Sequence, residues 1–466
     1  MLWVLLISCP SALAEMVLRP AELQRLLQQL DEVRQSHQTP AYSLIVTDAR
    51  HTLLSEIRGN VSAESKSPVA GDRWFRIGSI TKTFVALASM RAQEQQQLDL
   101  QEPVLQRLGA GYFKNPWVSQ EPLRLVHLLE QTSGLADMSK AEWDSNTPQG
   151  LEPALRRFAS QHRLSWPPGR YFSYSNTNYG LAGRVLEAAA GTPFADTLRR
   201  QVFAPLKMSK VAVRHSDNVG QLLVPGHDTD GRTRIPYWHM IYPPLGAISL
   251  APSEMAPVLR MFLNRGAPLL RAESIARMET PQSFRAAQAG LSYGYGVGLY
   301  DWFHLGHRFY GHGGDGDGYL AHFGYQRESG LAYFLVINAF QKPALTQMRQ
   351  LVETALVSGL PRPTPAHEFE LSNPKAYTGE YYPVSWRFGA KPGPQRLKIT
   401  QQGKQLMAEL VTGENTPAST FALIAVSATQ FRRRSEPAAT MALVQTPEGW
   451  LFSGDEGNFL KPAASP

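Results

Sequence analysis

The chain has 466 residues, and 43% of them are hydrophobic, which excludes an intrinsically disordered protein and is enough for one large core and a second, smaller one. The formal net charge of +7 comes from scattered basic residues, because only Arg432, Arg433 and Arg434 form a tight cluster. No basic groove with interleaved aromatic residues accompanies this cluster, so we interpret it as a solvated strand end and expect no nucleic-acid partner.

The first fourteen residues have the pattern of a signal peptide. An apolar run over residues 1–8 is too short to cross a bilayer, and Ala12-Leu13-Ala14 after it is an A-x-A cleavage site, although no basic residue precedes the run. In an alternative interpretation, residues 6–9 resemble a lipobox and Cys9 becomes the anchor of a lipoprotein. We favour cleavage because small residues occupy both positions that the peptidase reads. Both interpretations predict an exported protein, periplasmic or secreted.

After the leader, the sequence predicts neither a transmembrane span nor a metal site. No later apolar run approaches about 18 residues, so nothing there predicts a transmembrane span. Cys9 is the single cysteine, which excludes disulfides and thiolate metal sites from the rest of the chain. Asp315 and Asp317 lie in a glycine-rich stretch, but Gln326 stands where a calcium loop would end in glutamate. We therefore predict no metal.

The first predicted elements are a helix, a hairpin and a second helix. Residues 20–37 place leucines and a valine on one helical stripe. Residues 42–46 and 53–57 are strand-like and flank a short polar turn, which predicts an antiparallel hairpin of the central sheet. A helix running to about residue 97 then begins after Gly78.

Ser79 and Lys82 lie in the first turn of this second helix. No further charge follows Lys82 until Arg91, so we expect the lysine to be buried. Residues three apart on a helix share a face, which brings the amine within reach of the hydroxyl. A serine becomes a nucleophile when a neighbouring base takes its proton, and a desolvated lysine can be that base. Ser-x-x-Lys also occurs by chance, and the alternative is a helix start whose lysine extends to solvent.

The middle of the chain carries a second polar segment. Residues 123–129 are predicted as a helix that Gly134 ends. Residues 171–180 form an aromatic-rich polar loop that places Tyr174 and Asn176 side by side before the next helix. Ordinary turn chemistry, with local backbone hydrogen bonds, is the alternative interpretation of this loop.

The last third of the chain returns to strands. Residues 308–312 and 319–326 are predicted strands, with the glycine-rich stretch that begins at His312-Gly313-Gly314 between them, and 331–338 is a buried strand. So many glycines let another backbone, such as that of a substrate, lie against the strand edge. A helix over residues 343–360 completes this part of the chain.

A change of pattern near residue 361 predicts a second domain. Residues 361–372 begin with alternating prolines and form a stiff linker. Over residues 373–466, six short alternating segments follow one another without a helix, which predicts a small antiparallel barrel or sandwich.

Three motifs stand in order along the chain: Ser79-Ile80-Thr81-Lys82, Tyr174-Ser175-Asn176 and His312-Gly313-Gly314. With them the chain resembles the penicillin-recognising serine hydrolases, in the branch of class C β-lactamases, D-alanyl-D-alanine carboxypeptidases, D-aminopeptidases and family VIII esterases. The resemblance implies an α/β (α+β) fold of β-lactamase/transpeptidase type over residues 15–360. Such a domain has an antiparallel sheet flanked by helices, together with an all-helical subdomain.

The resemblance also implies roles for single residues. Ser79 is the acyl-accepting nucleophile, and Lys82 and Tyr174 are the proton-transfer pair, with Lys82 either lowering the pKa of Tyr174 or acting as the base directly. The backbone N–H groups of Ser79 and Asp315 would form the oxyanion hole. No metal or organic cofactor is implied. The residues expected to bind substrate are Asn176, which bonds its amide, and His312, Gly313, Gly314 and Asp315.

Two positions depart from the family pattern. His312 stands where many relatives carry lysine, and a neutral imidazole binds an anionic substrate less strongly at pH 7. Gln131 stands where relatives often have histidine, and we expect this change to affect only packing.

The predicted function is that of an exported serine hydrolase acting through an acyl-enzyme on D-amino-acid-containing peptides, amides or small esters. Its partner is then a small-molecule or peptide substrate, which includes fragments of peptidoglycan. One alternative is a β-lactamase that hydrolyses β-lactam antibiotics. The other is a penicillin-binding or cell-wall sensor protein that acylates without turnover.

Overall fold

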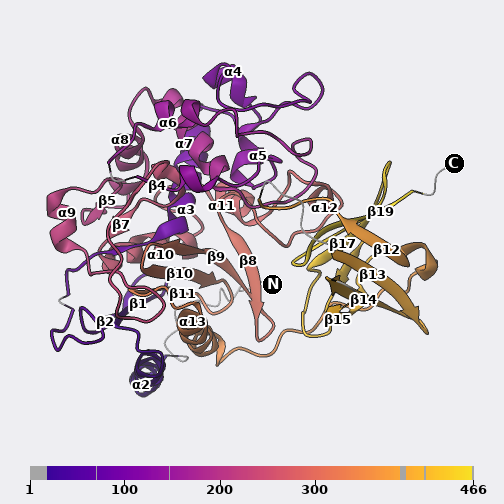
Figure 1. The fold of residues 1–466 in the computed structure, drawn as a ribbon. Helices are drawn as coiled ribbons and strands as arrows, with labels where there is room; N and C mark the ends of the chain where they lie inside the picture. The colour runs from indigo at the N-terminus through magenta and orange to yellow at the C-terminus, as the bar shows by residue number, and fades with distance from the viewer. Residues whose placement is uncertain (1–17, 70, 146, 389–394, 414–415, 464–466) are drawn as a thin grey trace, which may run out of the picture.

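The computed structural model describes residues 18–69, 71–145, 147–388, 395–413 and 416–463. The predicted signal peptide, with its cleavage site and its cysteine, lies outside these ranges. Figure 1 shows a larger domain built on one sheet, with a small barrel beside it. Within the described ranges, no helix combines the length and the apolar character that crossing a membrane requires.

A six-stranded antiparallel sheet in the order β2-β1-β11-β10-β9-β8 is the frame of the larger domain. The hairpin predicted near the start of the chain forms β2 and β1, and β1 pairs on its other side with β11. Both β1 and β11 are buried along their whole length, as the apolar sequence of β11 predicts. The six strands are Ala41–Thr47 (β1), Thr52–Gly59 (β2), Tyr300–His304 (β8), His307–Gly316 (β9), Tyr319–Gln326 (β10) and Leu331–Ile337 (β11).

Helices cover both faces of the sheet (Figure 1). The first helix of the described chain, α2, and the helix α13 pack together against one face, where Leu30 and Met348 share a cluster with Leu335. The opposite face, represented by Phe334, packs in a larger core with α3, α10 and the helical region that contains α4 to α8. The α-helices are Pro20–Ser36 (α2), Thr81–Glu94 (α3), Val104–Leu108 (α4), Leu125–Leu129 (α5), Leu151–Arg157 (α6), Asn176–Ala190 (α7), Phe194–Leu198 (α8), Asp217–Leu222 (α9), Met255–Leu263 (α10), Ala272–Glu279 (α11), Arg285–Gln288 (α12) and Lys342–Val357 (α13).

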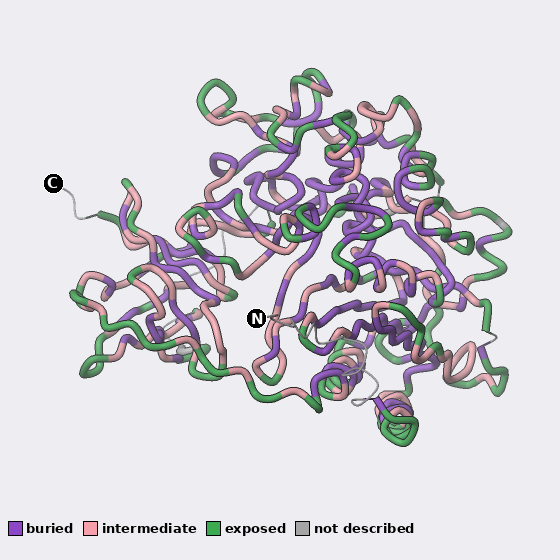
Figure 2. The backbone as a smooth tube through the Cα atoms, turned by 180° about the vertical axis from the view of Figure 1, so that it is seen from behind, coloured by how far each residue is buried: buried purple, intermediate pink, exposed green. Residues whose placement is uncertain are grey.

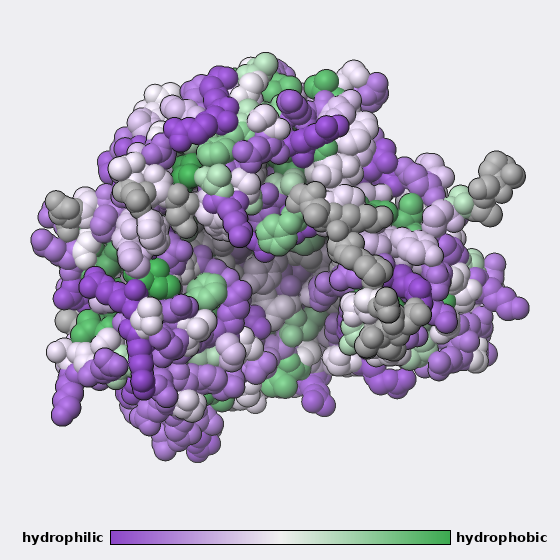
Figure 3. Space-filling model, viewed as in Figure 1, coloured by the Kyte–Doolittle hydropathy of each residue, from purple (hydrophilic) through white to green (hydrophobic). Residues whose placement is uncertain are grey.

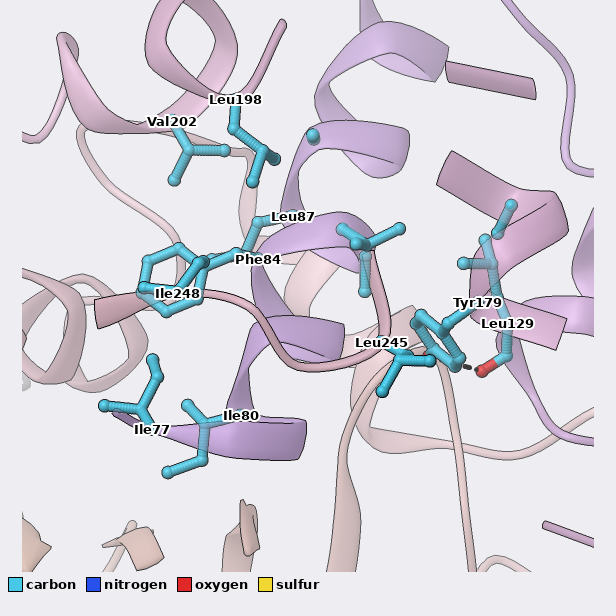
Figure 4. Close-up of a cluster of buried hydrophobic side chains, with 14 of the residues drawn as sticks. Ile77, Ile80, Phe84, Leu87, Leu129, Tyr179, Leu198, Val202, Leu245 and Ile248 are labelled. Atoms are coloured by element: carbon cyan, nitrogen blue, oxygen red, sulfur yellow. Dashed lines mark hydrogen bonds between the residues drawn. The ribbon is translucent and has the colours of Figure 1, made fainter. Parts of the chain in front are cut away.

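The helix α3 runs through the middle of this larger core, and Figure 2 shows the surrounding chain as largely buried. In Figure 4, Phe84 and Leu87 extend from α3 into the cluster of buried side chains that also contains Leu198, Val202 and Ile248. Nearby, the Tyr179 hydroxyl of α7 donates a hydrogen bond to the carbonyl oxygen of Leu129 at 2.8 Å. Close packing of this kind fixes the position of side chains at the start of α3.

Two glycine-containing segments differ from the sequence prediction. The helix expected to end at Gly134 ends at Leu129, because Gln131 takes a left-handed conformation with a φ of 60°. The stretch that begins at His312 is the second half of β9 rather than a connection between strands. It can continue as a strand because β10 pairs with it as far as Gly316.

The C-terminal segment is a closed barrel of eight strands, so the predicted small β domain is confirmed and takes the barrel form. The sequence prediction missed β16, which has three residues, and β19. The interpretation of the arginine cluster as solvated is wrong for Arg432, which is 6% exposed and donates a hydrogen bond to Ala366. The strands are Gly379–Pro383 (β12), Gln395–Gln402 (β13), Gln405–Thr412 (β14), Thr416–Ala425 (β15), Gln430–Arg432 (β16), Met441–Thr446 (β17), Gly449–Gly454 (β18) and Gly457–Pro462 (β19).

The barrel packs against the larger domain through polar and apolar contacts (Figure 1). Glu448, between β17 and β18, accepts hydrogen bonds from Arg170 and Arg285 of the larger domain. Leu451 of β18 shares an apolar cluster with Trp166 and Tyr171. Residues of the predicted linker, 361–372, contain no helix or strand.

Candidate active site

Ser79 and Lys82 occupy the junction between a 3-10 turn, Gly78–Ile80, and α3. Lys82 Nζ lies 2.9 Å from Ser79 Oγ and donates a second hydrogen bond to the carbonyl oxygen of Leu245 at 2.7 Å. The lysine is completely buried. The contact expected from the three-residue spacing is therefore present.

Burial changes the chemistry of this lysine. Desolvation lowers the pKa of Lys82 to about 7, and the positive charge of Arg387 acts in the same direction, while Asp137 opposes it. A large fraction of the side chain is therefore a neutral amine at neutral pH. Such an amine has a lone pair that can accept the proton of the Ser79 hydroxyl.

Tyr174 completes a three-residue cluster around Ser79 Oγ, to which its hydroxyl donates a hydrogen bond at 3.1 Å. Burial raises the pKa of Tyr174 well above that of a free phenol, although the bond with Ser79 partly opposes this. The phenol is thus protonated at neutral pH. Three side chains from two distant segments meet at one oxygen atom.

Gln131 holds the loop that carries Tyr174. Its Oε1 accepts hydrogen bonds from the backbone N–H of Ser175 at 2.9 Å and from Asn178 Nδ2 at 2.6 Å. Its carbonyl oxygen accepts another from the backbone N–H of Ser173 at 2.8 Å. The expectation that Gln131 affects packing alone is therefore wrong, because this amide fixes the loop on both sides of Tyr174.

Asn176 is the first residue of α7, and its side chain lines the cleft beside Ser79. Asn176 Nδ2 donates a hydrogen bond to Asp137 Oδ2 at 3.3 Å, and its backbone N–H donates to Asp137 Oδ1 at 2.7 Å. Among the described residues, Asn176 Oδ1 is buried and has no hydrogen-bond partner. This free acceptor is available to a substrate N–H.

His312 lies in the wall of the cleft, but both of its ring nitrogens are already engaged. Nδ1 donates to the carbonyl oxygen of Gly313 at 2.5 Å, so Nε2 is the acceptor for the hydroxyl of Tyr295 at 2.9 Å. Desolvation, with the nearby charge of Lys82, lowers the pKa of His312 to about 3. The imidazole is therefore neutral at physiological pH.

Gly313, Gly314 and Asp315 continue β9 along the cleft, directly beside the turn that carries Ser79. A Cβ atom on Gly314 would lie 1.9 Å from Ile77 O and 3.2 Å from Ser79 N. A Cβ atom on Gly78, whose φ is 50°, would lie 2.8 Å from Asp315 N. Only glycine permits this approach, which brings the backbone of Ser79 close to that of Asp315.

The cleft formed by these residues has a volume of about 450 Å³. The side chains of Trp143, Met240 and Phe340 add apolar surface to this cleft. Tyr174 and Tyr300 line both the cleft and a second, more apolar cavity of about 420 Å³ between the two domains. Figure 3 shows this face of the molecule hollowed between the larger domain and the barrel.

Two residues that border this cleft were not predicted from the sequence. Asp137 is the buried carboxylate behind Asn176. Arg387, which comes from the barrel domain, lines the cleft and bonds to Asp137. Asp137 lies two residues after the segment from Gln131 to Leu135, and this position could have drawn attention to it. No motif in the sequence marks Arg387.

Comparisons with known proteins agree with this geometry. A family model described as Beta-lactamase matches residues 23–356. The chain is 26% identical over 346 residues to penicillin-binding protein 4 of Amycolatopsis lactamdurans, a match that spans 67% of this chain and 84% of that protein.

Two solved structures share the fold. The octameric penicillin-binding protein homologue of Pyrococcus abyssi aligns with a TM-score of 0.63 and 20% identity over 94% of this chain and 100% of its own. The D-amino acid amidase of Ochrobactrum anthropi aligns with a TM-score of 0.61 and 22% identity over 72% of this chain and 99% of its own. The first of these alignments includes the barrel.

Proposed function

The chain belongs to the Beta-lactamase family and is a serine hydrolase, and from this premise we propose that it cleaves D-amino-acid-containing peptides, amides or small esters through a serine acyl-enzyme. We propose in addition that the protein is exported, on the basis of the signal-peptide pattern in its first fourteen residues.

The observation that carries the proposal is the meeting of Lys82 Nζ and Tyr174 OH at Ser79 Oγ, at 2.9 and 3.1 Å. Of the two roles considered for Lys82, the direct base fits better. Burial lowers the pKa of Lys82 and raises that of Tyr174, so the amine and not the phenol is ready to accept a proton near pH 7.

The proposed reaction has two steps. Ser79 Oγ attacks the substrate carbonyl while its proton passes to Lys82, and the backbone N–H groups of Ser79 and Asp315 stabilise the oxyanion. Tyr174 gives its proton to the leaving nitrogen or oxygen and recovers one from the Lys82 ammonium. Water then cleaves the acyl–Ser79 ester, which restores the enzyme.

Two features support a peptide or amide substrate. The strand β8 pairs with β9 only as far as Gly311, so beyond that residue no described strand pairs with the β9 edge opposite β10, and we propose that a substrate backbone pairs there. Asn176 lines the same cleft, and its Oδ1, which has no partner among the described residues, can accept a substrate N–H. The similarity in fold to a D-amino acid amidase favours D-amino acids as the acyl component.

Labelling at Ser79 tests the proposed nucleophile. We expect a fluorophosphonate probe to add one adduct to the wild-type protein at Ser79, and none to Ser79→Ala. We also expect Ser79→Ala to lower p-nitrophenyl acetate turnover at least about 10³-fold, because the acyl-enzyme cannot form. Equal melting temperatures of the two proteins would show that the fold is retained. Turnover retained by Ser79→Ala would contradict the proposal.

The substrate class needs its own measurement. We expect D-alanine p-nitroanilide to be cleaved in preference to the L-isomer, and nitrocefin to be cleaved slowly. Rapid nitrocefin turnover would instead identify a β-lactamase. A penicillin adduct that persists in the intact mass after removal of free ligand, without turnover of any ester or amide, would identify a penicillin-binding sensor.

A further inference from the structure

The catalytic cleft and the cavity between the two domains have two tyrosines in common. Among the described residues, Tyr174 and Tyr300 line both the cleft of about 450 Å³ and the cavity of about 420 Å³. The ring of Tyr295, which lines the cavity, has its centroid 6.1 Å from that of Tyr174 and 6.3 Å from that of Tyr300. The proposed mechanism gives Tyr174 a role and leaves Tyr300 without one.

The interdomain cavity is suited to apolar groups. The hydroxyl of Tyr295 bonds to His312 at 2.9 Å, and Trp302 Nε1 donates to Glu353 Oε1 at 3.0 Å, so the polar atoms of these two rings already have partners. Their carbon atoms remain as cavity surface, and an apolar group that leaves water gains stability there. The apolar and aromatic side chains of the lining include Phe172, Phe284, Leu291, Tyr293, Tyr295 and Trp302.

The ring of Tyr300 is held in place at its hydroxyl and at its sides. The hydroxyl lies 3.2 Å from His322 Nε2, and Arg349 Nη1 lies 3.3 Å from the same nitrogen. Since the arginine can only donate, Nε2 is an acceptor and the Tyr300 hydroxyl is its second donor. The rings of His312 and Trp302 pack beside that of Tyr300, with centroids 5.3 and 5.5 Å away.

A buried network behind His322 fixes this acceptor. Nδ1 of His322 donates to the hydroxyl of Tyr333 at 2.9 Å, and that hydroxyl donates to Glu353 Oε1 at 2.7 Å. All three side chains are buried. Desolvation lowers the pKa of His322 well below its usual range, so the imidazole is neutral and keeps a lone pair for the Tyr300 hydroxyl. Tyr300 is therefore a rigid part of the wall.

The proposed mechanism directs the leaving group toward this wall. Tyr174 gives its proton to the leaving nitrogen or oxygen, so the atoms attached to that nitrogen or oxygen lie beside Tyr174. We propose that Tyr300 is a specificity-determining residue, which closes the cleft toward the interdomain cavity and so restricts substrates to those with small leaving groups. This inference rests on the proposed function and adds to it a limit on the leaving group.

The test compares D-alanine methylamide with D-alanine octylamide as substrates of the full-length protein. Both would give the same D-alanyl ester of Ser79 and differ only in the amine that leaves, so effects on the nucleophile or on deacylation cancel in the ratio of their kcat/KM values. We expect an octylamide-to-methylamide ratio of about 1 or less for the wild type, since the octyl chain has no apolar pocket to enter.

Tyr300→Ala should raise this ratio at least about 10-fold, because the octyl chain can then leave water in the interdomain cavity. Tyr300→Phe is the matched control. It loses the bond with His322 but keeps the ring, so its ratio should stay within about twofold of the wild-type value. Leu291 lines the cavity and not the cleft. Leu291→Trp should therefore leave the wild-type ratio unchanged and, by filling the cavity, cancel the gain of Tyr300→Ala.

A wild-type ratio above about 10 would overturn the inference, as would an unchanged ratio in Tyr300→Ala at the wild-type melting temperature. If Tyr300→Ala does not fold, Tyr300→Leu removes the ring with a smaller loss of volume and must raise the ratio in the same way. If the wild type turns over neither the amides nor p-nitrophenyl acetate, the proposed function fails. The affinities of the two amides for the wild type and for Tyr300→Ala, measured by calorimetry, then still decide the role of Tyr300.

Discussion

Desolvation acts on Lys82 and Tyr174 in opposite directions. It removes the charge of the amine and preserves the proton of the phenol, because burial disfavours the charged form of either group. At neutral pH, Ser79 Oγ therefore lies between a protonated phenol and a lysine of which a large fraction is the neutral amine. Burial of this pair therefore supports the proposed roles, Lys82 as the base and Tyr174 as the acid.

The pH dependence of hydrolysis should report Lys82. Its pKa is lowered to about 7, so the reactive amine is the major form above that pH and falls about tenfold for each unit below it. We expect kcat/KM for p-nitrophenyl acetate, which does not titrate, to rise with pH and level off above about 7. A profile measured from pH 5 to 9 that is flat or falling through this range would contradict the role of the lysine as base.

Replacement of the Tyr174 hydroxyl should impair proton transfer more than binding. We expect Tyr174→Phe to lower kcat for an amide substrate by about 10²–10⁴ and to change KM little, because the ring remains and only the proton donor is lost. Tyr293→Phe is the control, since that hydroxyl bonds to Asp455 outside the catalytic cleft. Full activity of Tyr174→Phe would leave Lys82 as the only proton-transfer group.

The sequence predicted those residues of the candidate site that belong to short local motifs. Ser79, Lys82 and Tyr174 stand in local patterns whose chemistry can be argued from residue type and spacing. Arg387 could not be found in this way, because it lies 250 positions from its partner Asp137 and no local pattern marks it. The position of Arg387 beside Asp137 depends on how the barrel packs against the larger domain.

At the scale of elements, the site depends on the contact between β9 and the turn before α3. The turn approaches the strand so closely that glycine is required on both sides, at Gly78 and Gly314. This contact sets the spacing of the two backbone N–H groups proposed to stabilise the oxyanion.

A methyl group at Gly314 should disturb that spacing. A Cβ there would lie 1.9 Å from Ile77 O, so Gly314→Ala must push β9 away from the turn. We expect kcat to fall by about 10²–10³, the usual cost of losing one oxyanion donor, with a lower melting temperature.

Gly316→Ala provides a matched control on the same strand, because the nearest atom to its Cβ would be 3.7 Å away, an ordinary contact. It should keep the wild-type melting temperature in a thermal unfolding assay. Equal melting temperatures and kcat values for Gly314→Ala and the wild type would show that the strand and the turn are free to separate.

The spacing of hydrophobic residues along the sequence predicted most of the helices and strands, including α2, the β1–β2 hairpin and the buried strand β11. This spacing did not predict the segments whose secondary structure depends on pairing with another strand or on an unusual backbone conformation. The stretch from His312 has the composition of a loop, yet it is a strand because β10 pairs with it. The helix α5 ends early because Gln131 adopts a left-handed conformation, which sequence spacing does not reveal.

At the scale of the whole molecule, ion pairs join the barrel to the larger domain. Glu448 accepts hydrogen bonds from Arg285 and Arg170, and the contact with Arg285 is the main cause that lowers the pKa of Glu448 to about 2. The folded-state pKa is below the unfolded value, so the stabilisation is present above about pH 4.5 and is lost as the pH falls toward 2.

We expect Glu448→Gln to lower the melting temperature by about 1–3 °C at pH 7, because partly exposed ion pairs contribute about 1 kcal/mol or less. The difference from the wild type should shrink between pH 5 and 3 in thermal unfolding measurements. Glu370→Gln, which removes an exposed pair with Lys404, should not change the melting temperature. A deficit for Glu448→Gln that is constant across this pH range would assign the effect to packing.

The composition of the last 94 residues predicted a small β domain, but not its closure or its place beside the cleft. Closure depends on β19 returning to β12, a pairing between the two ends of the segment. The docking depends on contacts such as that of Leu451 with Trp166, which join residues far apart in the chain. Neither the closure nor the docking produces a periodic pattern of hydrophobic residues in the sequence.

The origin of Arg387 has a consequence for biogenesis. The ribosome completes Ser79, Lys82 and Tyr174 long before it reaches the codon for Arg387, so a nascent or prematurely terminated polypeptide contains the proposed nucleophile but lacks the cation that Asp137 binds. Cleavage by a protease between the two domains would have the same effect if the barrel then separated. The wall of the cleft that Arg387 forms is in this sense the last part of the site to be made, and it is lost first if the barrel is removed.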